Sequence, residues 1–130
     1  MVQDLRGESD DRAIRMMGGF GGGIGGMGSV CGAVVGAVAA LGVDRGKGTL
    51  EEKENSRLFP LSAELYRRFA EEIEVSPLCR DITGIDFTRP EQVKAYRNSP
   101  EKTGRCVKLV GRTAAMVYEM IRREERNTSS

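Results

Sequence analysis

The chain has 130 residues, a formal net charge of +1 and no histidine. A charge this close to zero argues against binding to nucleic acid or to an acidic membrane surface. Without histidine, the chain lacks the most common general base, zinc nitrogen ligand and haem ligand. Its length fits one domain, which we expect to comprise a flexible N-terminus (residues 1–9), a helical domain (residues 10–125) and a disordered tail (residues 126–130).

The first predicted helix covers residues 10–17, with aspartates at its start and Gly18 and Gly19 after its end. A glycine-rich loop then runs to Gly28. The next helix is expected over residues 30–41, with Ser29 as its N-cap and Gly42 at its end. This helix is apolar on every side, which predicts a place at the centre of the core rather than in a membrane, because about 20 residues are needed to cross a bilayer.

The remaining elements follow a charged loop over residues 44–57. A helix over residues 62–75 is predicted by an apolar stripe at four-residue spacing: Leu61, Leu65, Phe69 and Ile73. A short helical turn is expected over residues 76–84 with Pro77 at its first position, and another helix over residues 90–97. The last helix is predicted over residues 104–125 with a buried stripe of Val110, Ala114, Val117 and Ile121. No strand pattern is visible, so the fold class is an all-α, single-domain helical bundle.

Three cysteines carry the most distinctive chemistry of the sequence: Cys31, Cys79 and Cys106. Each is predicted in the first turn of a helix, where free backbone amides stabilise a thiolate and lower the thiol pKa. Arg80 and Arg105 are chain neighbours that add positive charge. The alternative is simple packing, because free cysteine is a small apolar residue that is commonly buried. No secretory signal is visible, so a reducing cytoplasm is expected, where cysteines more often serve metals or redox chemistry.

Two further groups of residues offer weaker sites. Gly23, Gly25 and Gly28 match the GxGxxG pattern, but a dinucleotide fingerprint needs a strand before the loop and here a helix is predicted. The loop amides could instead bind an anion or a cofactor edge, or the glycines could allow a close crossing of two backbone segments. Asp81 and Asp86 could serve acid–base chemistry, although capping of turns is the more common role for aspartate.

The sequence resembles a family of small redox-active proteins defined by four cysteines and a CGAxxG motif, the C_GCAxxG_C_C family. The motif is read at residues 31–36 within the glycine-rich stretch 18–43, residues 79–84 resemble a C-x-x-[IL]-x-G segment, and Cys106 resembles the last cysteine. The resemblance implies thiol redox or metal and cluster binding. This chain lacks the family's first cysteine, and Ile85 stands where relatives often have another.

The leading hypothesis is a redox-active cysteine protein. The alternative within this hypothesis is a degenerate member of the family that has lost its activity, and the sequence does not decide whether the protein is an enzyme. In the leading hypothesis Cys31 is the reactive thiolate, while Cys79 and Cys106 act as a disulfide partner or metal co-ligands. Three cysteines cannot close a four-ligand zinc or iron–sulfur site within one chain, so another chain, a carboxylate, a water or a small ligand would have to complete it. A redox partner protein is also implied. The alternatives are a non-catalytic helical module that forms homo-oligomers, with a dimer favoured, and anion or nucleotide binding by residues 18–28.

Overall fold

Seven α-helices, a 3-10 turn and a π-helical turn make up the regular structure of the computed structural model, which describes residues 2–129. Met1 and Ser130, the outermost residues of the predicted flexible N-terminus and tail, lie outside the described residues. The elements are α1 (Val2–Arg6), α2 (Asp11–Met16), η1 (Gly18–Phe20), α3 (Gly32–Arg45), α4 (Leu58–Arg68), η2 (Phe69–Ile73), α5 (Cys79–Thr83), α6 (Pro90–Arg97) and α7 (Pro100–Ser129). The predicted all-α fold is confirmed.

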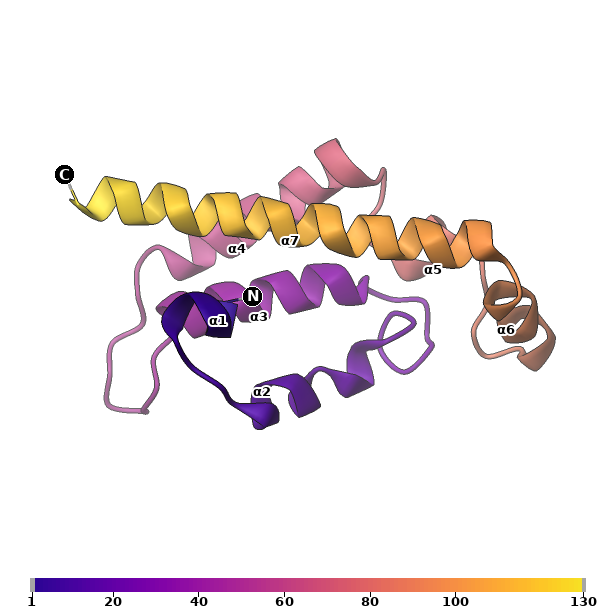
Figure 1. Cartoon of the computed structure of the whole chain (residues 1–130), viewed down its shortest axis with the longest axis horizontal. Helices are drawn as coiled ribbons and strands as arrows, with labels where there is room; N and C mark the ends of the chain where they lie inside the picture. Colours follow the sequence, from indigo (N-terminus) through magenta and orange to yellow (C-terminus); the bar gives the residue numbers. More distant parts are fainter. Residues whose placement is uncertain (1, 130) are drawn as a thin grey trace.

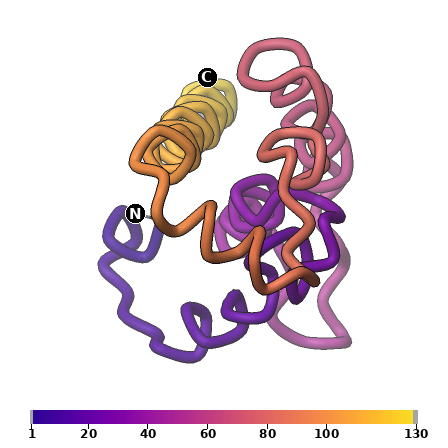
Figure 2. The backbone as a smooth tube through the Cα atoms, turned by 90° about the vertical axis from the view of Figure 1, so that its right-hand side faces the viewer, coloured from indigo at the N-terminus to yellow at the C-terminus, as the bar shows by residue number. Residues whose placement is uncertain are grey.

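Helix α3 lies at the centre of the molecule and contacts α1, α4 and α7. The long helix α7 runs along the whole molecule, with α6 at one of its ends (Figure 1). Seen from that end, α4 and α7 lie on one side of α3, and the N-terminal segment with α1 and α2 lies on the other (Figure 2). Among the described helices, none is both long and apolar enough to span a membrane.

The core forms where α3, α4 and α7 meet. The predicted stripe on α4 and η2 is confirmed for Leu61, Leu65 and Phe69, each 0% exposed, and Ile73 packs against the same core. Leu41 from α3 and Met120 from α7 are equally buried. Because a fully buried aliphatic or aromatic side chain contributes about 1.5–3 kcal/mol, this layer supplies much of the stability of the fold.

Several helix boundaries differ from those predicted. Helix α3 begins at Gly32 with Cys31 as its N-cap, so Ser29 is not the cap, because the backbone around Val30 is extended and pairs with Leu78. It passes Gly42 and ends at Arg45, with Gly46 as its C-cap. Pro77 precedes α5 instead of opening it.

Helix α7 begins at Pro100, earlier than predicted, and continues past residue 125 through Ser129. The hydroxyl of Ser99 accepts a hydrogen bond from the amide of Lys102 at 3.3 Å, as expected of a cap followed by proline. Val117 and Ile121 are buried as predicted, and Ala114 is half-buried. Val110 is 54% exposed, so its predicted place in the buried stripe is wrong.

Candidate functional site: three cysteines around one cavity

Two extended segments that are far apart in the chain pair at the start of α3 and α5. Val30 and Leu78 form an antiparallel bridge. The amide of Cys31 donates to the carbonyl of Pro77 at 2.7 Å, and the amide of Cys79 donates to the carbonyl of Ser29 at 2.7 Å. This pairing fixes the first turns of α3 and α5 relative to each other, and each turn carries one of the predicted cysteines.

The glycine loop packs against the same pairing. Its central residues, Gly22, Gly23, Ile24, Gly25 and Gly26, all have φ between +59° and +79°, a left-handed conformation that favours glycine. At Gly23 a Cβ atom would lie 2.5 Å from the amide nitrogen of Ser29 and 2.8 Å from the Cβ of Cys79. The close crossing of backbone segments therefore explains this glycine.

All three predicted cysteines line one cavity of about 300 Å³. Its other walls come from the glycine loop, α3, α5, the segment after α5, α6 and α7, and they are mostly apolar: Gly22, Gly32, Ala33, Ile82, Thr83, Phe87, Tyr96, Leu109 and Val110. The structure therefore brings together the three cysteines that the sequence predicted as site residues. All three thiols are free in this structure.

Cys31 and Cys79 do not have the lowered thiol pKa that their predicted positions implied. Burial raises the pKa of the Cys31 thiol above its usual value, although the amides of Ala33 and Val34 act in the opposite direction. Burial also raises the pKa of the Cys79 thiol, and a negative charge on Cys31 would raise it further. At Cys31 the effect of these amides is outweighed by the loss of water around the sulfur atom.

Cys106 is half-buried and belongs to the second turn of α7, so its predicted first-turn position is wrong. The reason is the earlier start of the helix at Pro100. Its neighbour Arg105 forms an ion pair with Glu74, with 2.7 Å between Nη2 and Oε2. Arg80 is exposed and does not line the cavity. Neither arginine therefore lines the thiol cavity, and the positive charge that the sequence predicted beside Cys79 and Cys106 is not in its walls.

Tyr96 is a site residue that the sequence analysis missed. Its ring lies in the cavity wall and meets the ring of Phe87 edge to face, with 5.2 Å between centroids and 73° between planes. Burial raises the pKa of Tyr96 to about 12, together with the interaction of its hydroxyl with Cys106 and charge on Cys79. No motif marks this tyrosine, because its contact with Cys106 depends on how α6 folds back on α7.

The glycine loop has few backbone amides that are free to bind a ligand, because most of them donate to carbonyls within the loop. The amides of Gly25 and Gly28 donate to the carbonyls of Gly19 and Gly22, at 2.9 Å and 3.0 Å. Those amides are therefore not available to the anion or cofactor predicted for Gly23, Gly25 and Gly28. Among residues 2–129, no group of three or more histidine, cysteine, aspartate or glutamate side chains could hold a metal ion. The metal role of Cys31, Cys79 and Cys106 stays a prediction.

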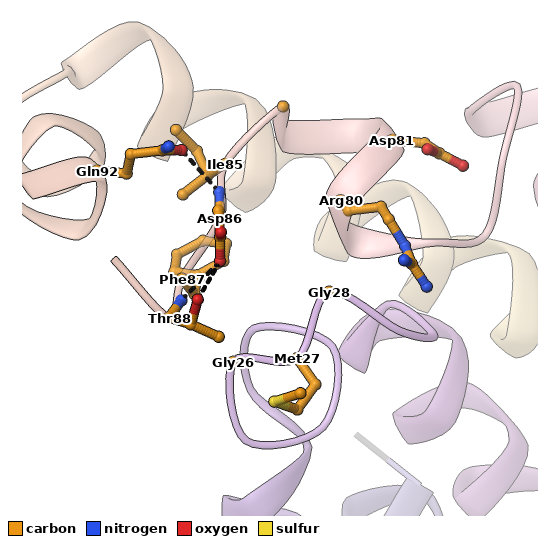
Figure 3. Close-up of a pocket in the computed structure, with 11 residues that line it drawn as sticks. Gly26, Met27, Gly28, Arg80, Asp81, Ile85, Asp86, Phe87, Thr88 and Gln92 are labelled. Atoms are coloured by element: carbon orange, nitrogen blue, oxygen red, sulfur yellow. Dashed lines mark hydrogen bonds between the residues drawn. The ribbon is translucent and has the colours of Figure 1, made fainter. Parts of the chain in front are cut away.

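A second, more open cavity of about 630 Å³ lies on another side of the glycine loop. Figure 3 shows Arg80 extending toward the loop, with Asp81 pointing away from it. The carboxylate of Asp81 accepts a hydrogen bond from the Ser76 hydroxyl at 2.6 Å, and Asp86 accepts from the amide of Thr88 at 3.0 Å (Figure 3). Both aspartates hold turns of the backbone, so they do not form the paired acid–base site considered above.

The model of the family described as Putative redox-active protein (C_GCAxxG_C_C) matches residues 1–120. This chain belongs to that family of redox-active proteins. No curated protein and no solved structure matches it.

Proposed function

We propose that this chain acts by thiol–disulfide exchange at the cavity lined by its three cysteines. The observation that carries the proposal is the convergence of Cys31, Cys79 and Cys106, from three separate segments, on one small cavity. Membership of a redox-active family supports the same chemistry.

Within this proposal Cys31 and Cys79 form the disulfide pair. The hydrogen bonds across the Val30–Leu78 bridge hold the backbone of both residues, so little chain entropy remains to be lost when the sulfur atoms join. Oxidation removes two electrons and two protons from the two thiols and forms one S–S bond. Cys106, next to Tyr96, is the third thiol and serves to modulate the pair. No step is assigned to a metal.

Titration with mixtures of oxidised and reduced dithiothreitol tests the proposal. The number of free thiols should fall from three to one in a single two-electron transition. The Cys106→Ser variant should show the same transition, whereas Cys31→Ser and Cys79→Ser should not. Three thiols that stay reduced in fully oxidised dithiothreitol, in a folded protein, would contradict thiol–disulfide exchange.

A second candidate function, assembly into a homodimer, is favoured by one face of α7. Val107 is 71% exposed, Val110 54% and Tyr118 41%, and these side chains follow one another along the helix at roughly helical spacing. An apolar helix face of this kind is a common contact surface between protein chains. Analytical ultracentrifugation tests it: a monomer at all concentrations would exclude the dimer without affecting the proposed thiol chemistry.

A further inference from the structure

The walls of the thiol cavity carry no aspartate, glutamate, lysine or arginine side chain. This holds although Arg105 and Lys108 are chain neighbours of Cys106 and Leu109, both of which line it. Apart from sulfur, the polar side chains in the walls are Thr83 and Tyr96. The hydroxyl of Thr83 already donates to the carbonyl of Cys79 at 2.8 Å. No charged side chain in the wall compensates the charge of an ionic ligand.

The size of the cavity limits its occupant as well. Its volume of about 300 Å³ is at the small end of ligand pockets, which span roughly 300–1,000 Å³. Val110 is the most exposed of the lining residues, at 54%, and so marks the side from which we expect access, whereas Cys79 is 8% exposed. A charged molecule that reached the sulfur atoms would lose its water without gaining an oppositely charged side chain as a partner, and that loss is costly.

We propose that the substrate of this cavity is a small, uncharged, apolar disulfide, and that charged thiol compounds and peptide chains are excluded. This inference rests on the proposed thiol–disulfide function and names the class of its oxidant. The thiolate of Cys31 attacks one substrate sulfur, the substrate S–S bond breaks, and one substrate thiolate leaves and takes up a proton. The thiolate of Cys79 then attacks the sulfur of Cys31 and releases the second substrate thiol. One substrate disulfide is reduced to two thiols while two protein thiols become one disulfide.

The test uses reduced wild-type protein and three methanethiosulfonates that share one leaving group, methanesulfinate. The propyl reagent is uncharged, the sulfonatoethyl reagent is an anion and the trimethylammonioethyl reagent is a cation. Each rate of modification, followed by mass spectrometry, is divided by the rate of the same reagent with free cysteine. The propyl reagent should then be at least about tenfold faster than either charged reagent at Cys31, because both ions must be desolvated.

Two tryptophan substitutions show whether the reagent enters through the cavity. Val110→Trp narrows the opening and should slow the propyl reagent at least about fivefold, by the usual sensitivity of buried reactive groups to access. Val75→Trp is the matched control, because Val75 is 94% exposed, does not line the cavity and lies outside the apolar face of α7. It should leave the rate unchanged.

Equal corrected rates for the three reagents in wild type would overturn the proposed substrate class, whatever the variants do. Such a result would leave the proposed function intact if the dithiothreitol titration still shows one disulfide. Failure of that titration, in contrast, would remove the proposed function itself. Equal slowing by Val110→Trp and Val75→Trp would show that access does not depend on this cavity and would also count against the substrate class.

Discussion

The amides of Cys31 and Cys79 each donate a hydrogen bond of 2.7 Å across the same short antiparallel pairing, one to Pro77 and the other to Ser29. Two cysteines from distant parts of the chain are thereby fixed at the starts of α3 and α5. Cys106 joins them from α7 at a shared cavity.

The pH dependence of thiol modification follows from the burial of Cys31 and Cys79. Burial raises the pKa of each thiol above 9.0, so the thiolate fraction at pH 7 is smaller than in free cysteine. Alkylation by uncharged iodoacetamide should therefore be slower at pH 7 than for free cysteine, and its rate should rise about tenfold per pH unit up to pH 9. A rate that levels off below pH 8 at Cys31 would contradict the raised pKa.

Tyr96 should be distinguishable from the other tyrosines by its ionisation. The pKa of Tyr96 is raised to about 12 by burial, by its interaction with Cys106 and by charge on Cys79. Ultraviolet absorbance near 295 nm should show one phenol that ionises at this high pH, absent in Tyr96→Phe but present in the control Tyr66→Phe. Cys106→Ala should lower the pKa of Tyr96. No effect of Cys106→Ala would mean that burial alone sets the ionisation.

Gly23 should tolerate a side chain far less well than Gly25, although both have positive φ. A Cβ at Gly23 would lie 2.5 Å from the amide nitrogen of Ser29, whereas nothing lies within 4 Å of a Cβ at Gly25. Gly23→Ala should lower the free energy of unfolding by about 2–4 kcal/mol, and Gly25→Ala by only about 1 kcal/mol. Urea denaturation measures both. Equal losses would show that the loop does not pack as closely on Cys79 as described.

Two acidic side chains should make the fold sensitive to acid. The bidentate hydrogen bond from Arg123, at 2.7 and 2.8 Å, lowers the pKa of Glu64, and Arg57 lowers the pKa of Glu124 in the same way. Because the folded pKa lies below the unfolded one, the stabilisation is present above the unfolded value of 4.5 and is lost as pH falls through the folded pKa.

Glu64→Gln should therefore reduce stability at pH 7 by about 1 kcal/mol, the scale of a partly exposed ion pair, and weaken the acid dependence. Glu51→Gln, at an exposed position in the loop before α4, is the control and should change neither. Urea denaturation at pH 7 and pH 3 measures both variants. A Glu64→Gln protein that is as stable as wild type at pH 7 would contradict the role of this pair.

Local patterns predicted much of the helical fold. The helix Pro90–Arg97 and the buried stripe of Leu61, Leu65 and Phe69 follow from proline placement and four-residue spacing, which act over a few residues. The start of α3 was wrong because the extended backbone at Val30 depends on pairing with Leu78, which no local pattern encodes. The start of α7 at Pro100, in contrast, has a local signal: a serine cap, Ser99, followed directly by proline.

The site shows the same division. Residue type alone predicted Cys31, Cys79 and Cys106 as candidates. The thiol pKa of Cys31 and Cys79 depends on how much water the surrounding segments exclude, and that requires the packed structure. Tyr96 lines the cavity because α6 packs against α7, and the spacing of residues within α6 does not reveal that packing. The cavity itself is formed by residues from many segments, so its uncharged wall could not be predicted.

Peptide mapping of the oxidised protein tests the central claim most directly. Wild-type protein equilibrated with oxidised dithiothreitol should yield, after blocking of free thiols and proteolysis, a peptide pair joined by a Cys31–Cys79 disulfide, with Cys106 blocked. The same pair should form in Cys106→Ser at equal protein concentration. Recovery of all three cysteines as blocked thiols, or only of disulfides between two chains, would contradict thiol–disulfide exchange within one cavity.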